Sequence, residues 1–372
     1  MWHEKREMQA ENSGFYGETM LTLARNIHAL LDKSAEEELR TLLAGAEHSF
    51  LFDPVSVHKL GRSAVLIAGS PGDRRLLVVA DCGKRLPDGF EGERFALDDG
   101  GVLLCCGFSA ANAAALRRHF PWCTPKVVPK TGRTAGFAFG AGARGRLEAV
   151  REAGCFPVIS GWPDEVVFFL FASDFRDGYA VNGGCASTPA EAERLFRSGA
   201  TLALLRPCGG GGMEADYAGK RFVIGSGVEV FDGDTAARCC ASCGGLADFA
   251  AKLGGGERRC SLGIALDGEE KPTRPEEHLF VVREMRKRNV DFAILFPRWP
   301  EKPAAFGELL RRHAAIARTF GGYRISIPLD RIADGMHGAL RQLEDGIVHL
   351  ELGEASGTDF TNHFHGSGLK ET

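Results

Sequence analysis

Apolar and polar positions alternate in two different ways along the chain, and the change falls near residue 130. In the first part, residues 15–46 predict helix, because Leu21, Leu23, Ile27 and Leu31 recur roughly on one face. Glycine, proline and aspartate turns then separate three short apolar runs, which predict a small antiparallel sheet: SAVLIAG (63–69), RLLVVAD (75–81) and GVLLCCG (101–107).

Prolines mark the boundary between the two parts. Pro121, Pro125 and Pro129 interrupt the stretch PWCTPKVVPKTGRT, which follows a predicted helix. We therefore predict an N-terminal α+β domain over residues 1–130 and a second domain over residues 131–372.

The second part alternates strand-like runs with amphipathic helices, of which residues 303–320 show the clearest helical period. The predicted strands are 135–139, 155–160, 177–181, 201–207, 259–267, 290–297, 323–329 and 346–352. Eight strands joined by helical crossovers predict a (β/α)8 barrel of the TIM type, an α/β fold. The connection 208–258 is long and glycine-rich, and residues 353–372 make a poor closing helix, so the prediction leaves the completeness of the last helix open.

Three capping boxes predict helix starts within these segments. They pair Ser34 with Glu37, Thr188 with Glu191, and Thr273 with Glu276.

Composition excludes several classes of function. The 372 residues are 44% hydrophobic and 25% charged, as in an ordinary soluble globular protein, and the net charge of −4 gives no electrostatic reason to bind nucleic acid or an anionic membrane. No apolar run approaches membrane-spanning length, and the charged start lacks the apolar core of a signal peptide. The 11 cysteines show no disulfide-like framework, and the single pair Cys240 and Cys243 is more typical of free thiols than of a zinc site. We predict a reducing, cytoplasmic location.

One glycine motif has two interpretations. Gly140, Gly142 and Gly145 form GxGxxG between a predicted strand and a predicted helix, and Asp164 and Glu165 lie about twenty residues further on. Such a turn suits a dinucleotide, because its glycines allow close approach and the helix start attracts the pyrophosphate. A glycine-rich loop of the barrel is the structural alternative.

In a barrel of this kind, the groups that do chemistry lie at the C-terminal ends of the strands. The predicted ends carry Ser160, Asn182, Cys185, Arg206, Asp267, Glu269, Glu270, Arg298, Asp330, Glu351 and Glu354, with His349 inside the last strand. Carboxylates beside arginine and histidine suit acid–base chemistry on a small polar anion. The alternative is that these are solvated loops whose negative charge favours a helix start.

Four stretches resemble the tagaturonate epimerase family of hexuronate catabolism. They are EGERFALDDGGVLLCCGFSAANAAALRRHFPWCTPKVV (91–128), GYAVNGGCASTPAEAERLFRSGATLALLRP (178–207), PTRPEEHLFVVREMRKRNVDFAILFPR (272–298) and LLRRHAAIARTFGGYRISI (309–327). The resemblance extends from about residue 55 to 355, and its PxxPEEH and RHAAIAR motifs are the most specific.

This resemblance implies a barrel enzyme, an isomerase, that uses a divalent metal cation to interconvert the ketohexuronates tagaturonate and fructuronate. The inverted carbon is β to the ketone, so the carbonyl does not acidify its C–H, and a retro-aldol step followed by an aldol step is the expected route. The resemblance implies Asp267 and Glu270 as acid–base groups. The same resemblance assigns Arg298, Asn182 and His278 to substrate binding, and Cys185 and His349 to the metal.

The chain also departs from the family pattern. Cys185 stands where the family has a histidine, and Pro328 follows Ser326-Ile327 where the family has His-Ser-Gly. Two further hypotheses therefore stay open: a non-catalytic descendant that binds a sugar acid or a partner protein, and a dinucleotide-dependent enzyme that uses Gly140–Gly145. The expected ligand is a small sugar acid, and the sequence does not indicate an oligomeric state.

Overall fold

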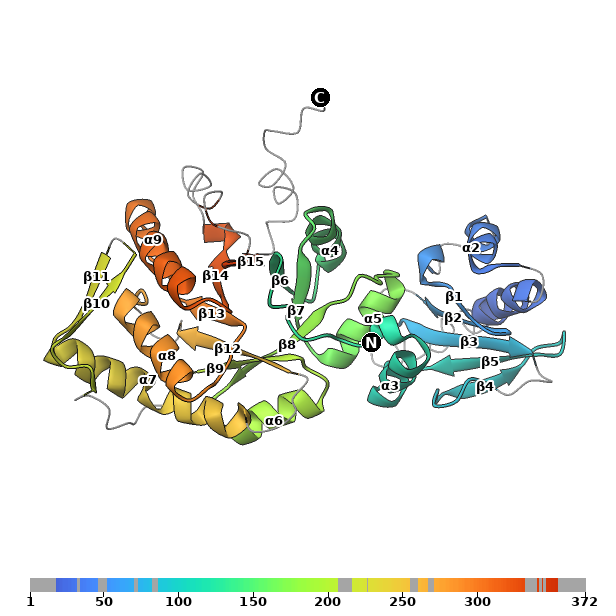
Figure 1. Ribbon diagram of the computed structural model, residues 1–372. Coiled ribbons are helices and arrows are strands. Elements are labelled where there is room, and N and C mark those ends of the chain that lie inside the picture. The colour runs from blue at the N-terminus through green and yellow to red at the C-terminus, as the bar shows by residue number, and fades with distance from the viewer. Residues whose placement is uncertain are drawn as a thin grey trace, which may run out of the picture. The chain divides into compact units, whose positions relative to one another are not determined.

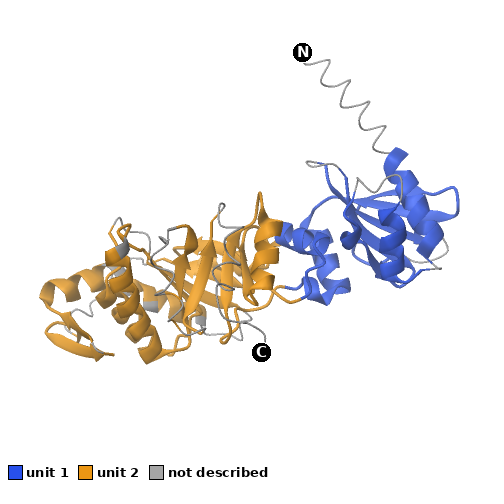
Figure 2. Ribbon diagram, turned by 90° about the horizontal axis from the view of Figure 1, so that it is seen from above, with its two compact units in different colours: residues 1–124, 164–176 blue, residues 125–163, 177–372 orange. Residues whose placement is uncertain are grey.

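The computed structural model describes most of the chain (Figure 1). The described residues are 18–31, 34–45, 52–69, 73–81, 86–206, 216–225, 227–254, 260–266, 271–331, 340, 343 and 346–353. The chain folds into two compact units, residues 1–124 with 164–176 and residues 125–163 with 177–372 (Figure 2). The sequence placed the boundary at 130 and did not anticipate that residues 164–176 group with the first unit.

The first unit is built on an antiparallel five-stranded sheet of order β1-β2-β3-β5-β4. Its strands are β1 (His58–Leu60), β2 (Ser63–Ala68), β3 (Arg75–Asp81), β4 (Glu93–Ala96) and β5 (Gly101–Cys106). The three predicted strands are confirmed as β2, β3 and β5. The other two are short, and the polar composition of Glu93–Ala96 gave no apolar signal.

Alternate residues of a strand point to opposite faces of the sheet. Since β2 is buried at every position, both faces of the sheet pack against apolar side chains. Ala64 and Leu66 pack with helix 18–31 and with α2 (Glu36–Ala44). Val65 and Ile67 pack instead with α3 (Ala110–His119), with η3 (Pro121–Cys123) and with α5 (Pro163–Ala172). The predicted helix 15–46 is thus two helices, and the second begins after Ala35 with no side-chain cap, so the Ser34 capping box does not form.

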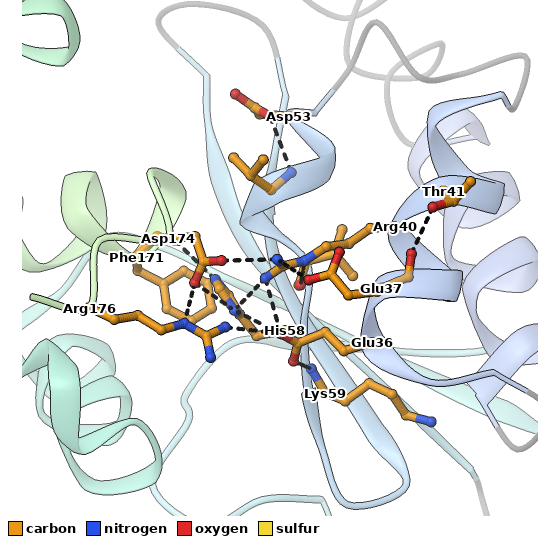
Figure 3. Close-up of polar contacts among 12 residues, drawn as sticks. Glu36, Glu37, Arg40, Thr41, Asp53, His58, Lys59, Phe171, Asp174 and Arg176 are labelled. Carbon is orange, nitrogen blue, oxygen red and sulfur yellow. Dashed lines mark hydrogen bonds and ion pairs between the residues drawn. The ribbon is translucent and has the colours of Figure 1, made fainter. Parts of the chain in front are cut away.

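A buried polar cluster fastens residues 171–176 to α2 and β1 (Figure 3). His58 is 1% exposed, and Arg40 Nη2 lies 3.1 Å from its Nδ1 while Arg40 Nη1 donates to Asp174 Oδ2 at 2.9 Å. Since arginine only donates, the proton of the neutral His58 ring is on Nε2, which donates to the Phe171 carbonyl at 3.1 Å. Burial lowers the pKa of His58 and so favours this neutral form. The cluster satisfies its own members, and we interpret it as structural.

The second unit is a closed barrel, which confirms the predicted fold. Eight described strands pair in parallel in the order β12-β13-β14-β15-β6-β7-β8-β9. Their bounds are β6 (Thr134–Ala138), β7 (Phe156–Ser160), β8 (Ala180–Ala186), β9 (Leu202–Leu205), β12 (Ser261–Leu266), β13 (Ile294–Pro297), β14 (Arg324–Pro328) and β15 (Val348–Leu352). The strand predicted at 177–181 begins three residues later and extends further.

Helices connect most of these strands. They are α4 (Ala143–Glu152), α6 (Pro189–Arg197), α7 (Gly233–Gly254), α8 (Pro275–Lys287) and α9 (Pro303–Phe320). Between β9 and α7 the chain inserts an antiparallel hairpin, β10 (Lys220–Ile224) and β11 (Gly227–Phe231), which the sequence did not predict. Residues 354–372, where the closing helix was in question, lie outside the described residues.

Two of the predicted capping boxes can be compared directly. At α6 Thr188 is the capping residue, since its Oγ1 accepts from the Glu191 N–H at 3.2 Å, but the Glu191 carboxylate accepts from the Ser187 N–H at 2.8 Å, so the second bond of the box does not form. At α8 the helix begins one residue later than predicted, because Arg274 is the capping residue and its N–H donates to the Glu277 carboxylate at 2.8 Å. The hydroxyl of Thr273 is used elsewhere.

Candidate active site

The barrel interior changes from apolar to polar toward the C-terminal ends of the strands. Val158, Ala180, Leu202, Ala265 and Ile294 come from five strands and pack into one apolar cluster. Residues two positions further along a strand face the same side. By this alternation β7 directs Ser160, and β8 directs Asn182, toward the interior at the end where barrel enzymes carry their chemistry.

His349 and Glu351 form a hydrogen-bonded pair on the inner face of β15. The His349 ring is 0% exposed, and its Nε2 lies 2.8 Å from Glu351 Oε1. Its Nδ1 lies 2.8 Å from the hydroxyl of Thr134 on the neighbouring strand β6. With Glu351 ionised, Nε2 carries the proton, and in a neutral ring Nδ1 accepts from Thr134. Glu351 is 29% exposed, so it is the member of the pair that a ligand can reach.

Gly136 leaves the space that this pair fills. A Cβ at Gly136 would lie 2.7 Å from Glu351 Oε1 and 2.8 Å from both Glu351 Oε2 and His349 Nε2. Such distances are too short for non-bonded atoms, so any side chain at this position displaces the pair.

A second polar pair joins β7 and β8. Asn182 is 7% exposed, and its Nδ2 donates to Ser160 Oγ at 3.1 Å. Its Oδ1 accepts from the Gly184 N–H at 3.0 Å, across a bulge that ends at Cys185. Gly184 has a φ of 100°, which favours glycine. Asn182 thus lies inside β8, level with Ser160 at the end of β7, whereas Cys185 follows the bulge and is exposed.

Arg298 follows the last residue of β13, and its main chain is fixed on both sides. Its N–H donates to Thr273 Oγ1 at 2.9 Å, and its carbonyl accepts from the Thr273 N–H at 2.9 Å. The side chain is half-buried and lies two positions beyond Phe296, which packs against the apolar interior. This position suits the predicted contact with a substrate carboxylate.

His278 is buried inside the protein, on helix α8. It is 0% exposed within α8, where its Nδ1 faces His313 at 2.9 Å and its Nε2 faces the Tyr323 hydroxyl at 2.6 Å. Both ring nitrogens are occupied, which corrects the prediction that His278 contacts the substrate. The resemblance assigned it to the substrate, but its place on α8 turns the ring into the protein.

Asp267 and Glu270 lie outside the described residues, which stop at Leu266 and resume at Lys271. Their acid–base role stays a prediction. The sequence shows only that Asp267 directly follows the last residue of β12.

A divalent cation would need more ligands than the described residues provide. Within the described ranges, no group of three or more His, Cys, Asp or Glu side chains could hold a metal ion. His349 has Thr134 and Glu351 at its two nitrogens, and Cys185 is exposed beyond the bulge. One imidazole and one carboxylate are fewer than the three protein ligands of a usual catalytic zinc site. The described residues therefore do not fit the metal by themselves.

The glycine turn of the dinucleotide hypothesis lies between β6 and α4. Gly142 is left-handed, with a φ of 71°, and Arg146 Nη2 donates to the carbonyls of Ala138 and Ala141 at 3.0 and 2.8 Å. Asp164 pairs with Arg117 at 3.0 Å in the first unit. The turn therefore belongs to a closed barrel, and Asp164, one of the two acidic residues expected to assist it, is engaged elsewhere, so the structure gives this hypothesis no support.

The cysteines of α7 are typical of a helix core. Cys239, Cys240 and Cys243 are all buried, and burial raises the pKa of the Cys239 thiol. Such thiols are weak nucleophiles and weak metal ligands.

Comparisons with known proteins agree with this architecture. The model of a family described as tagaturonate epimerase matches residues 211–329. The tagaturonate/fructuronate epimerase of Thermotoga maritima is 22% identical over 339 residues, which cover 76% of this chain and 69% of that protein.

Two crystal structures of the fructuronate-tagaturonate epimerase UxaE from Cohnella laeviribosi show a similar fold. The complex with one glycerol has a TM-score of 0.65 and 22% identity, and the complex with two glycerols has a TM-score of 0.64 and 23% identity. Each match covers 80% of this chain and 71% of that chain.

The closed parallel barrel, with polar side chains at the C-terminal ends of its strands, defines a (β/α)8 barrel protein. The comparisons confirm the resemblance found in the sequence: the chain is similar to the tagaturonate epimerases in sequence and in fold. The proteins to which it is similar are named as epimerases, which belong to the isomerase class. Among the described helices, none combines the length and the hydropathy that a membrane-spanning segment needs.

Sequence reasoning assigned His349 to a metal and did not pair it with Glu351. The sequence could have indicated this pair, because His349 and Glu351 are two residues apart on the last predicted strand and therefore share a face. Thr134 gave no such signal, since its contact with His349 depends on the pairing of β15 with β6, at opposite ends of the barrel sequence.

Proposed function

We propose that this protein is an epimerase of ketohexuronates of the tagaturonate–fructuronate type. The observation that carries the proposal is the buried His349–Glu351 pair inside the barrel of a chain related to the tagaturonate epimerases. A carboxylate hydrogen-bonded to a buried imidazole can accept a proton and return it, which is what an epimerisation with no net change requires.

The chemistry of the substrate favours carbon–carbon cleavage over direct deprotonation. The inverted carbon is β to the ketone, so its C–H is not acidic. Removal of the proton from its hydroxyl instead lets the bond to the neighbouring carbon break, giving an aldehyde and the enediolate of the ketone fragment. When the aldehyde turns and presents its other face, the bond re-forms with inverted configuration and the hydroxyl regains its proton. Atoms and electrons balance, with no oxidant or reductant.

In this scheme Glu351 is the group that exchanges the hydroxyl proton. It is the exposed member of the pair, and His349 orients its carboxylate through the 2.8 Å hydrogen bond. Thr134 fixes the ring from the other side. Asp267 and Glu270 are proposed as further acid–base groups on the strength of the family resemblance alone.

Arg298 and Asn182 are proposed to hold the sugar acid. A guanidinium can bind the carboxylate through two parallel hydrogen bonds, which fixes its orientation as well as its position. Asn182 directs the Ser160 hydroxyl at the strand ends, where the pair can bind a substrate hydroxyl.

We propose that the protein binds a divalent cation, but no step of the scheme above depends on it. It would stabilise negative charge on the ketone fragment if bound. His349 and Glu351 are of the donor types it accepts, but the described residues do not complete a site. Metal analysis of the purified protein, with activity measured before and after chelation, tests this point.

The experiment for the function is a rate measurement on tagaturonate and fructuronate with a matched pair of variants. Glu351→Gln should lower kcat by about 100-fold or more, since it removes the acid–base group and keeps the shape. Glu308→Gln, a 56% exposed carboxylate on α9, should leave kcat unchanged. Equal rates for the two variants would refute the proposal, and binding of a uronate without turnover by the wild type would favour the non-catalytic descendant.

A further inference from the structure

The two histidines of the family-like motifs meet in the interior of the barrel unit. His278 of PxxPEEH and His313 of RHAAIAR are each 0% exposed, and their Nδ1 atoms lie 2.9 Å apart. The rings stack with centroids 5.1 Å apart at an angle of 28°. The proposed reaction uses neither imidazole. The presence of two buried, hydrogen-bonded histidines therefore needs a separate explanation.

The hydrogen bonds of this pair have a single consistent direction. His313 Nε2 lies 3.2 Å from the Thr273 carbonyl, and a carbonyl only accepts, so Nε2 carries a proton. Burial lowers the pKa of both imidazoles, that of His313 to about 4, so both rings are neutral near pH 7. His313 Nδ1 then accepts from His278 Nδ1–H, and His278 Nε2 accepts from the Tyr323 hydroxyl at 2.6 Å. The result is one directed chain from Tyr323 through both histidines to Thr273.

Thr273 joins this chain to two strand ends. Its hydroxyl donates to the Leu266 carbonyl at 3.0 Å and accepts from the Arg298 N–H at 2.9 Å. Its own N–H donates to the Arg298 carbonyl at 2.9 Å. Leu266 is the last residue of β12, and Arg298 directly follows β13, which pairs with β12. Thr273 therefore links the C-terminal ends of two adjacent strands at the candidate active site.

A buried polar chain of this kind fixes geometry more than it adds stability. Each buried polar group must keep its partner, since an unpaired one costs free energy in a low-dielectric interior. The orientation of His313 therefore constrains the Thr273 carbonyl, and Thr273 constrains the main chain of Arg298. Apolar side chains could fill the same volume without imposing these directions.

We propose that His278, His313 and Thr273 are positioning residues, which hold Arg298 and the end of β12 where the substrate carboxylate binds. The inference rests on the proposed function, because Arg298 matters only if the barrel binds a sugar acid. It accounts for the two motif histidines and replaces the expectation that His278 touches the substrate.

Substitution of Thr273 gives a clean test. Thr273→Val keeps the shape and removes both hydroxyl hydrogen bonds, whereas Thr273→Ser keeps them. We expect Thr273→Val to lower kcat/KM about 100-fold, mainly through a higher KM for the sugar acid, and Thr273→Ser to stay within about 3-fold of wild type. Wild-type kcat/KM in folded Thr273→Val would overturn the proposal.

Two more variants separate positioning from stability. His313→Leu interrupts the chain next to Thr273 and should raise KM at least about 10-fold. Tyr217→Phe breaks a different buried bond of the same unit, between Tyr217 and Glu284, and should lower the melting temperature while kcat/KM stays at the wild-type value. Equal loss of kcat/KM in Tyr217→Phe and His313→Leu would show a general effect of stability and overturn the proposal.

Hydrogen exchange distinguishes this inference from the function on which it rests. In Thr273→Val the Arg298 amide loses its acceptor, so its exchange should accelerate at least about 10-fold relative to wild type. If the wild type does not epimerise either uronate while exchange responds as expected, the proposed function fails and the anchoring of Arg298 stands. If the wild type is active and Arg298 exchange is unchanged in Thr273→Val, the positioning inference fails and the function stands.

Discussion

Gly136→Ala offers the sharpest perturbation of the His349–Glu351 pair, because it adds one methyl group and no new chemistry. The added Cβ would lie 2.7 Å from Glu351 Oε1 and 2.8 Å from His349 Nε2. An ordinary contact between such atoms is about 3.4 Å or longer, so one partner must move by roughly half an ångström or more. His349 is fully buried and held by Thr134 at its far nitrogen, so Glu351 is the group that moves.

The size of the effect follows from this geometry. Overpacking in a core costs about 1–3 kcal/mol, and the cost here should fall at the lower end because a carboxylate at the end of a flexible side chain can rotate. Catalysis should suffer more than stability, since a displacement of about 1 Å at an acid–base group can cost about 100-fold in rate. We therefore expect kcat to fall about 100-fold while the protein stays folded.

Thermal melting and steady-state rates on tagaturonate measure the two effects side by side. Gly145→Ala is the matched control, because Gly145 lies within helix α4 with nothing within 4 Å of its added Cβ. It should raise stability by about 0.5–1 kcal/mol and leave kcat unchanged. A Gly136→Ala protein with the wild-type kcat would refute the reasoning, since the pair would have tolerated displacement.

Three further predictions concern other parts of the chain. In urea unfolding, Arg40→Ala should lower the free energy of unfolding by about 2–3 kcal/mol, since it removes the donor to the buried Val57 carbonyl and to His58 Nδ1. Arg25→Ala, which removes the exposed pair with Asp98, should cost less than about 1 kcal/mol, and equal costs would contradict the distinction. The pKa of His313 is lowered from 6.5 to about 4, so below pH 6.5 the unfolded state takes up a proton that the folded state does not, and stability should fall by about 3 kcal/mol between pH 6.5 and 4; unfolding curves of His313→Leu should lack this part of the pH dependence. Arg298→Lys should raise KM for the sugar acid about 10-fold with a smaller change in kcat, because an ammonium cannot bind a carboxylate through two parallel bonds; an unchanged KM would exclude the clamp.

The barrel could be predicted because its strands are short apolar runs separated by amphipathic helices, a pattern that local sequence carries well. The hairpin β10–β11 and helix α7 could not, because glycine and cysteine dilute the helical period of GDTAARCCASCGGLADFAAKLG and the neighbouring segment is glycine-rich. Helix α5 was expected to belong to the barrel, yet Val167 and Phe171 pack in the core of the first unit. Such a choice between two cores is decided by tertiary contacts.

In the candidate site, too, local sequence predicts some features and tertiary contacts decide the others. Strand ends can be located by pattern, which singled out Asn182 and Arg298, and their contact with a ligand stays a prediction. Which side chains meet across the barrel depends on register, and the bulge at Gly184 leaves Cys185 exposed in a way that no local signal indicated. His278 failed for a related reason, since the sequence shows that it begins a helix but not which neighbours its ring contacts.

The central claim is that the barrel epimerises a ketohexuronate by breaking and re-forming a carbon–carbon bond. It is tested most directly by incubating the purified protein with tagaturonate in D2O and following the products by NMR. The account predicts fructuronate that keeps protium at the inverted carbon, because that C–H is never cleaved. Deuterium at the inverted carbon, or no conversion at all, would contradict it.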